Sequence, residues 1–373
     1  MFHFLPPPLS TVVPFLIVLG VLVFFHELGH YLAARACGVH VEAFSIGFGR
    51  PIARWRDRAG TEWRVSMLPL GGYVKLHGQE RPEDAGADVR AGWQPGRTFH
   101  EKRVAARAVV IAAGPIANFV LAIVLYALLF ASAGKPVADP AAMIGDLQVP
   151  SAASRAGLQV GDRIESIDGQ PVHDFADIRA QVLPHPDTRL VLSVRRGGVL
   201  LSVPVTTDAR SENGRKVGLL GVSAAVDYER LPPLEAVRQG ASQTWQVAEQ
   251  TVIGVWQMIS GQRGAEDLGG PLRIAQLSGE VAALGLASLV NFVAVLSINL
   301  GLINLFPIPI LDGGHLLFYL VEALRGRPLP ARAQEYGFRA GFALLAALFV
   351  FATWNDLAHF GLVHWVANLI GRS

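Results

Sequence analysis

The sequence predicts a polytopic α-helical membrane protein with about four transmembrane helices, a membrane-associated β-hairpin on the cytoplasmic side and one α/β domain outside the membrane. Two observations carry this prediction. Of the 373 residues, 51% are hydrophobic and only 17% are charged, which is the balance of a membrane protein. Four apolar stretches also reach the ~20 residues that a helix needs to cross a bilayer. The lipid bilayer is therefore an expected partner.

The four predicted crossings divide the chain into segments. The transmembrane helices are predicted at 1–36, 104–134, 283–312 and 340–362. Between them we expect a loop with the β-hairpin at 37–103, the α/β domain at 135–209, an amphipathic linker with interfacial helices at 210–282 and a loop at 313–339. Four crossings place both termini on the same side of the membrane.

The distribution of basic residues predicts the orientation. The loop after the first crossing is rich in them, whereas the first ten residues contain no lysine or arginine. The basic residues of that loop are Arg50, Arg54, Arg56, Arg58, Arg64, Lys75, Arg81, Arg90, Arg97, Lys102 and Arg103. By the positive-inside rule the loop is cytoplasmic, and the α/β domain is extracytoplasmic.

Charge and cysteine content exclude two classes of site. The net charge of +2 is small and the basic residues are scattered, so the sequence predicts no nucleic-acid partner. The single cysteine, Cys37, rules out an internal disulfide and a cluster of thiolate metal ligands.

The stretch "FFHELGHYLAAR", Phe24–Arg35, ends the first apolar segment. Residues four apart lie on one face of a helix, so His26 and His30 can bring their imidazoles to one ion. Glu27 lies ~100° around the helix from His26, where its carboxylate can reach an activated water without binding the metal. Ionisable groups at membrane depth need a partner, a cavity or an ion, which makes a purely structural interpretation costly.

Two histidines leave a catalytic zinc site one protein ligand short. The stretch "NLFPIPILDGGH", Asn304–His315, ends the third apolar segment, where two prolines interrupt the helix. Asp312 is the candidate for the missing ligand, because it is flanked by glycine and lies toward the same side of the membrane as His26. His315 is the alternative ligand, with a role beside the metal site or at a helix start favoured for it.

Four motifs in one order resemble the site-2 protease family of intramembrane zinc metalloproteases, and within it the bacterial members that regulate sigma-E. They are "HELGH", "SMLPLGGYVK" at Ser66–Lys75, "GPIANF" at Gly114–Phe119 and "NLFPIPILDGGH". The resemblance implies one Zn²⁺ per chain held by His26, His30 and Asp312. It also implies Glu27 as the catalytic base and Asn304 as a polar contact for the substrate.

The same resemblance implies a substrate and a location. The substrate is a protein with a single transmembrane helix, such as an anti-sigma factor or a signal-peptide remnant, whose cleavage releases its cytoplasmic part. The enzyme is then expected in the bacterial inner membrane, with its active site toward the cytoplasmic side.

The motif "SMLPLGGYVKL" has two short apolar runs around Gly71 and Gly72. This pattern predicts a β-hairpin that dips into the membrane and whose edge adds the unwound substrate as another strand. Gly71, Gly72 and Tyr73 are therefore candidate substrate-binding residues. An ordinary cytoplasmic hairpin explains the pattern equally well, and only the family resemblance favours the first interpretation.

The motif "GPIANF" lies in the first turns of the second crossing. Small residues there predict close helix packing, and Asn118 becomes a buried amide that bonds to the first or third crossing. We expect a structural rather than a catalytic role for Asn118.

The extracytoplasmic segment resembles a single PDZ domain. "RIESIDGQPV" predicts a strand and an Asp-Gly turn, "FADIRAQVL" a helix, and "LVLSVRRGGVLLSVPV" two strands. Such a domain binds a peptide or a periplasmic segment of the substrate by strand addition, or acts as a size filter. The well-known sigma-E relatives carry two such domains, so screening by a paired module is in doubt.

The linker contains one helical stripe of apolar residues: Trp245, Val252, Val255, Trp256 and Ile259. It predicts either a helix packed on the protein or an interfacial helix at the outer leaflet that gates access, and the tryptophans favour the second.

Two other functions compete with an intramembrane zinc endopeptidase. One is a catalytically inactive membrane scaffold that presents its PDZ-like domain, but a scaffold has no need of a glutamate between two ligating histidines. The other is a metal transporter, in which polar groups should spread over several crossings rather than cluster at one end of two.

Overall fold

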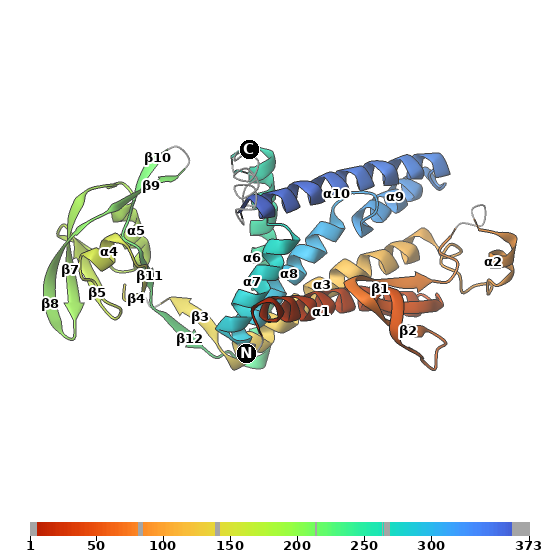
Figure 1. Cartoon of the computed structure of the whole chain (residues 1–373), viewed down its shortest axis with the longest axis horizontal. Coiled ribbons are helices and arrows are strands. Elements are labelled where there is room, and N and C mark those ends of the chain that lie inside the picture. The colour runs from red at the N-terminus through yellow and green to blue at the C-terminus, as the bar shows by residue number, and fades with distance from the viewer. Residues whose placement is uncertain are drawn as a thin grey trace, which may run out of the picture. The chain divides into compact units, whose positions relative to one another are not determined.

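The computed structural model describes residues 6–80, 85–138, 142–212, 215–262, 264 and 269–359. The chain divides into two compact units (Figure 1). The membrane unit consists of Met1–Leu129 and Pro233–Ser373, and the soluble unit is Phe130–Pro232.

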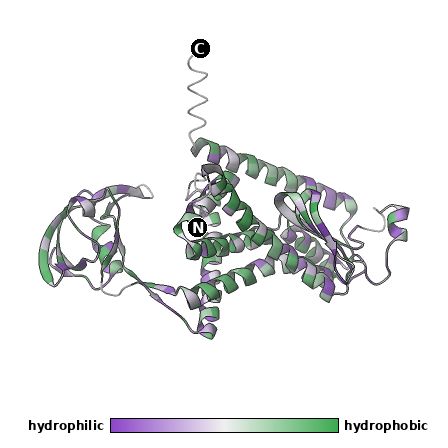
Figure 2. Ribbon diagram, turned by 60° about the horizontal axis from the view of Figure 1, so that its bottom comes forward, coloured by the Kyte–Doolittle hydropathy of each residue, from purple (hydrophilic) through white to green (hydrophobic). Residues whose placement is uncertain are grey.

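Among the described residues, four helices are long and apolar enough to cross a membrane, as predicted. They are α1 (Pro7–Ala36), α3 (Val104–Ser132), α8 (Leu286–Leu305) and α10 (Ala331–His359). Hydrophobic residues predominate along these helices in Figure 2. Each lacks the polar face of a surface helix because lipid as well as protein surrounds it. Positions 360–362 of the predicted fourth crossing lie outside the described residues.

The predicted loops of the membrane unit contain further helices. A short helix, α2 (Ala87–Ala91), lies in the first loop, and α6 (Pro233–Ile259) and α7 (Pro271–Leu284) form the predicted helical part of the linker. The range 313–339, expected as a loop, instead contains α9 (Asp312–Arg325) and the start of α10. The prediction failed here because the hydropathy of α9 is too low for a crossing, although one face of the helix is apolar.

Helix α7 packs against α1 and α10. Its first turn is capped by Asp356 of α10, whose carboxylate accepts hydrogen bonds from the backbone amides of Gly270, Leu272 and Arg273 at 2.8 to 3.1 Å. Asp356 is only 2% exposed. A buried carboxylate is stable here because it satisfies amides that have no partner within a helix.

The loop between α1 and α3 contains two long antiparallel strands, β1 (Val41–Arg56) and β2 (Glu62–Leu76). Gly71 and Gly72 lie inside β2, so the predicted hairpin turn at these glycines is wrong. The turn is at 57–61 instead. Gly71, at φ 146°, supplies a bend within the strand, and Gly47 and Gly49 supply the matching bend in β1 at φ 88° and 86°.

These bends divide β1 and β2 into four shorter segments, here called runs, that lie side by side. Run 41–46 pairs with 72–76 on one side and with 62–65 on the other, and 62–66 also pairs with 51–56. The outer runs are therefore 72–76 and 51–56. Phe44, fully buried, contacts Phe24 and Tyr31 of α1, which fixes this sheet against the helix.

The soluble unit has the predicted α/β composition. Its largest sheet has the order β6-β5-β7-β8, formed by β5 (Arg163–Ile167), β6 (Gln170–Pro171), β7 (Arg189–Arg196) and β8 (Val199–Thr206). Two helices, α4 (Ala152–Arg155) and α5 (Phe175–Val182), accompany it. The core consists of buried aliphatic side chains that include Ile144, Ile164, Leu192 and Val194.

The soluble unit extends beyond the predicted boundary at 209. Three strand pairs complete it: β3 (Lys135–Ala138) with β12 (Val226–Glu229), β4 (Ile144–Leu147) with β11 (Val222–Ala224), and β9 (Asp208–Glu212) with β10 (Arg215–Leu219). The stretch assigned to the linker therefore supplies strands that return to the start of the unit. Such long-range pairing leaves no signal in the local hydrophobic pattern.

One ion pair inside the soluble unit gives a testable pH dependence. Arg196 donates two hydrogen bonds of 2.7 Å to Asp162, whose side chain is 1% exposed. These bonds hold the pKa of the Asp162 carboxyl below its ordinary value of 3.8. The pair therefore stabilises the folded unit above about pH 4, and this contribution is lost as pH falls through the lowered pKa.

Replacing Arg196 with methionine should destabilise the soluble unit by roughly 1.5–3 kcal/mol at neutral pH, because the buried carboxylate loses its charged partner. Hydrogen exchange of peptides from β5 and β7 in the full chain measures the effect. The difference between variant and wild type should shrink in acid. Equal protection of the two proteins at neutral pH would contradict the prediction.

Candidate metal centre and active site

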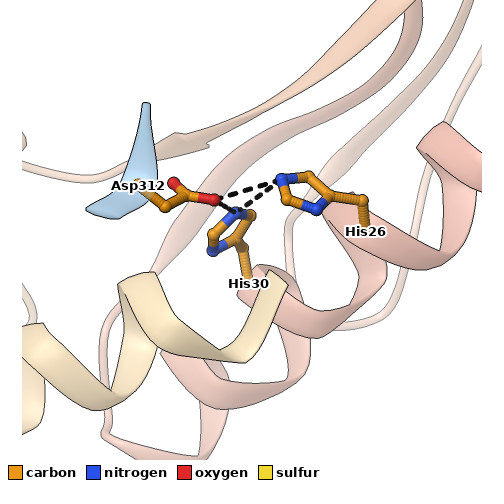
Figure 3. Close-up of side chains that lie close together, drawn as sticks. All are labelled: His26, His30 and Asp312. Carbon is orange, nitrogen blue, oxygen red and sulfur yellow. Dashed lines mark hydrogen bonds and ion pairs between the residues drawn. The ribbon is translucent and has the colours of Figure 1, made fainter. Parts of the chain in front are cut away.

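His26 and His30 project from the same side of α1 (Figure 3). Their ring centroids are 4.9 Å apart and their Nε2 atoms are 3.3 Å apart. Both residues lie within an uninterrupted part of α1, where one helical turn separates them.

Asp312 comes to this pair from the first turn of α9. Helix α8 ends at Leu305, and an irregular stretch with Pro307 and Pro309 leads into α9. Gly313 and Gly314 follow Asp312, and a Cβ atom on either would lie 2.6 Å or less from a backbone atom of 305–309. Glycine is therefore required for this tight return, which turns Asp312 toward α1.

The three side chains form a nearly equilateral triangle of possible ligand atoms. Asp312 Oδ2 lies 3.3 Å from His26 Nε2 and 3.4 Å from His30 Nε2. Zinc bonds of about 2.0–2.2 Å to nitrogen and oxygen place ligand atoms of a tetrahedral site about 3.3–3.5 Å apart. The triangle thus matches one face of such a site, and the fourth position is left for water or substrate.

Three atoms that face one another support a cation at this position. Asp312 Oδ2 is buried, has no hydrogen-bond partner among the described residues, and lies 3.3 and 3.4 Å from the Nε2 atoms of His26 and His30. Each imidazole turns its Nε2 toward it, while its Nδ1 is engaged elsewhere. A metal ion satisfies all three facing lone pairs at once, so the residues present fit a divalent cation with nitrogen and oxygen ligands.

Helix α3 sets the orientation of both imidazoles. His30 Nδ1 lies 2.9 Å from the Val110 carbonyl oxygen, which is an acceptor and therefore places the proton on Nδ1. This tautomer leaves Nε2 free for a metal. Gly114 makes the contact possible, since a Cβ there would lie 2.2 Å from His30 Nε2.

Asn118 orients the other imidazole. Its side-chain nitrogen lies 3.1 Å from His26 Nδ1, and its side-chain oxygen is buried with no hydrogen-bond partner in the described part of the chain. With a metal on Nε2, His26 carries its proton on Nδ1, and a half-turn of the amide then presents the Asn118 oxygen to that proton. The Ser297 hydroxyl of α8 also donates a hydrogen bond of 2.8 Å to the backbone carbonyl of Asn118.

The sequence predicted a bond from Asn118 to a neighbouring crossing but not its place beside a candidate ligand. The available signal was the spacing of Asn118 from the close-packing glycine, Gly114, which puts both residues on one face of α3. Asn118 is therefore a positioning residue for His26.

Replacing Asn118 with alanine should lower metal affinity by about 10- to 100-fold, the usual cost of losing an outer partner of a ligand. Metal content after dialysis against graded chelator measures this. Asn118→Asp, which keeps an acceptor, should recover most of the affinity. The same loss in both variants would contradict the orienting role.

Glu27 lies between the ligand triangle and the sheet. The backbone amide of Val74 in β2 faces its carboxylate, and the two imidazoles and Asp312 are its nearest charges. A Cβ on Gly72 would lie 3.0 Å from Glu27 Cγ. Gly72 thus allows run 72–76 to pass directly beside the predicted base.

The ligand triangle does not include the remaining residues that the sequence predicted for the site. Tyr73 accepts a hydrogen bond from Arg64 and stacks on Phe48, and Gly71 also adjoins Phe48. Asn304 donates to the Leu300 carbonyl of its own helix, and the structure does not bring it into hydrogen-bond contact with the triangle. His315 packs against Phe318 and Phe338, outside the ligand cluster.

An ion pair that the sequence did not predict ties α9 to α3. Arg107 donates to Glu322 at 2.6 Å, their side chains are 16% and 14% exposed, and the guanidinium lies over the Tyr319 ring. This pair fixes the helix that begins with Asp312 against the helix that orients both histidines.

The comparisons with known proteins agree with this centre. The model of "Peptidase family M50" matches residues 14–348. The chain belongs to peptidase family M50. Its predicted membership of the site-2 protease family is thereby confirmed.

The relatives of this M50 peptidase span almost its whole length. A protein named a zinc metalloprotease in Rhizobium meliloti (strain 1021) is 44% identical over 361 residues, covering 93% of this chain and 96% of the relative. The regulator of sigma-E protease RseP of Salmonella typhimurium (strain 14028s) is 34% identical over 444 residues, covering 92% and 97%. Because that alignment is longer than this chain, the Salmonella protein contains inserted sequence that this one lacks.

Among solved structures, the PDZ domain of the SdrC-like protein from Listeria monocytogenes matches 24% of this chain and 90% of that domain, with 15% identity and a TM-score of 0.21.

Proposed function

We propose that this M50 peptidase is an intramembrane zinc endopeptidase that hydrolyses a peptide bond in or near the transmembrane helix of a single-span protein. The observation that carries the proposal is the triangle of His26, His30 and Asp312, with Glu27 beside it, at the end of a membrane-spanning helix. The names of the relatives support zinc as the metal. One ion per chain would be held by the three side chains.

When bound, zinc supplies Lewis acidity to a carbonyl oxygen and to water. The protein's own groups do the rest. Glu27 accepts a proton from the attacking water and delivers it to the amine that leaves. Val110 and Asn118 keep the imidazoles in the required tautomers, and Val74 holds the Glu27 carboxylate in place.

The substrate must be extended before it is cut, because a helix engages the carbonyls of its peptide bonds. Run 72–76 is an outer run of the β1–β2 sheet and passes Glu27. A substrate strand added along this edge would lie beside the base and the ligand triangle. We assign Gly71, Gly72 and Tyr73 to this edge, and Asn304 of α8 as a further polar substrate contact.

The soluble unit offers a separate peptide site. A groove of about 800 Å³ runs between α5 and the segment Gly218–Ser223. We assign this groove to a peptide or to an extracytoplasmic segment of the substrate, bound by strand addition as in PDZ domains. Its charged lining residues are Arg179, Arg210 and Asp146, and the excess of one positive charge favours acidic sequences.

We infer a bacterial inner-membrane location with the metal centre toward the cytoplasm and the soluble unit outside. The basic residues of 37–103 support this orientation. The relative that regulates sigma-E supports an anti-sigma factor as the substrate.

Purified protein in lipid nanodiscs, mixed with a single-span model substrate, tests the proposed function. Cleavage within or beside the transmembrane segment, its loss with a zinc chelator and its return with zinc are the expected results. The fragments are identified by mass. Cleavage that survives complete removal of metal would refute the zinc mechanism, and cleavage confined to a soluble peptide would refute the intramembrane assignment.

A further inference from the structure

The outer run 51–56 of the β1–β2 sheet and the residues that flank it carry an excess of positive charge that their own surroundings do not neutralise. Arg50, Arg54, Arg56 and Arg58 are all exposed, and in the described part of the chain none of them forms an ion pair. We call these four residues the arginine edge. Exposed arginines without an ion pair are available to an anionic ligand from outside the sheet.

The acidic residues beside the arginine edge are already engaged. Asp57 accepts hydrogen bonds from the Tyr31 hydroxyl, the Trp63 indole and the amides of Ala59 and Thr61, so both of its oxygens are occupied. Glu62 accepts a 2.8 Å bond from Arg64. Because Glu62 already bonds to Arg64, its single negative charge cannot also neutralise the arginine edge.

Apolar side chains are exposed among these arginines. Ile52 is 71% exposed and Trp55 is 52% exposed. At the bend of the sheet, Phe48, Met67 and Leu68 are 43%, 62% and 54% exposed. Tryptophan and arginine beside exposed aliphatic groups are typical of the membrane–water interface rather than of a surface in contact with water alone.

The position of the sheet along α1 agrees with an interfacial location. Gly72 contacts α1 at Val23 and Glu27, whereas the turn at Asp57 bonds to Tyr31, nearer the end of the helix at Ala36. The sheet therefore covers the last turns of a membrane-spanning helix. In a bilayer crossed by α1, the bend of the sheet would point toward the apolar interior and its turn would lie at the level of the lipid headgroups.

We propose that the arginine edge binds the phosphate groups of anionic phospholipids in the leaflet that adjoins the sheet. Guanidinium groups match phosphate geometry, and basic clusters beside a membrane-spanning helix attract anionic lipids. A soluble polyanion would also neutralise the arginines, but it leaves Ile52, Trp55 and the bend in water. The lipid surface accounts for both the charge and the apolar groups, and it would anchor the sheet whose other outer run passes Glu27.

A dye on a single cysteine tests the proposal. The label is placed at Ala53→Cys in a Cys37→Ser background, and the full chain is incorporated into nanodiscs of phosphatidylcholine with increasing phosphatidylglycerol. Quenching by a headgroup-linked nitroxide reports contact with the lipid. Quenching should rise with phosphatidylglycerol and weaken with salt.

A pair of matched variants isolates the arginine edge. Arg54→Gln with Arg56→Gln should lower the apparent affinity for phosphatidylglycerol by roughly tenfold or more, since each arginine near an anionic surface contributes about fivefold. Arg163→Gln with Arg189→Gln removes the same charge from exposed strands of the soluble unit and should change nothing.

Other outcomes overturn the proposal. Equal quenching with and without phosphatidylglycerol, or an equal effect of both double variants, would show that the arginine edge does not bind anionic lipid. If inorganic phosphate shifts the dye as phosphatidylglycerol does, a free anion is the ligand. If only an oligonucleotide shifts it, the edge binds a soluble polyanion. None of these outcomes depends on whether the metal centre is catalytic.

Discussion

Replacing Glu27 with glutamine should leave zinc bound and slow cleavage of a single-span substrate by on the order of 10²- to 10⁴-fold, the usual contribution of a general base. Glutamine has the same shape as glutamate but cannot accept the proton of the attacking water. Glu27 lies outside the ligand triangle, so the metal keeps its protein ligands. Cleavage rate and zinc content are measured on the same preparation.

A surface glutamate provides the control for this substitution. Glu249 is exposed on α6, and Glu249→Gln makes the same chemical change away from the centre. It should cut at the wild-type rate. If Glu27→Gln also cuts at the wild-type rate, another group takes the proton and the mechanism proposed for this residue is wrong. If Glu27→Gln instead loses its zinc, Glu27 is a metal ligand.

Replacing Asp312 with alanine should lower zinc affinity by more than the roughly 10- to 100-fold caused by losing an outer partner, because a direct ligand disappears. The two imidazoles of α1 then remain without the carboxylate that faces them at 3.3 and 3.4 Å. Zinc content per chain, measured after dialysis against chelator, should fall far below that of the wild type. Cleavage should fall with it.

His315→Ala is the matched control, because sequence alone left His315 as the alternative ligand. Its ring packs against Phe318 and Phe338 and lies outside the triangle, so this variant should keep its zinc. If His315→Ala loses zinc while Asp312→Ala retains it, the ligand set is wrong and the first turn of α9 binds metal through its histidine.

The parts of the fold that depend on local periodicity could be predicted from sequence. Four apolar helices follow from hydropathy, and the approach of His26 to His30 follows from a spacing of one helical turn. The Asp-Gly turn after β5 and the two glycines between β7 and β8 lie where the sequence pattern placed them.

Features that depend on distant contacts could not be predicted in the same way. Gly71 and Gly72 have apolar runs on both sides, and this pattern fits a turn as well as a bend within β2. Strand β11 belongs to the soluble unit because it pairs with β4, far earlier in the chain. The spacing of Gly114 and Asn118 puts both residues on one face of α3, but it does not show that this face meets His26, which depends on the packing of α3 against α1.

X-ray absorption at the zinc edge tests the central claim most directly, namely that one ion is shared between α1 and α9. The wild-type protein should show only nitrogen and oxygen neighbours at about 2.0–2.2 Å, with the scattering of two imidazoles. Asp312→Ala, loaded with zinc, should retain both imidazoles and lose one protein oxygen. A spectrum unchanged by that substitution, or one with sulfur or a single imidazole, would contradict the account.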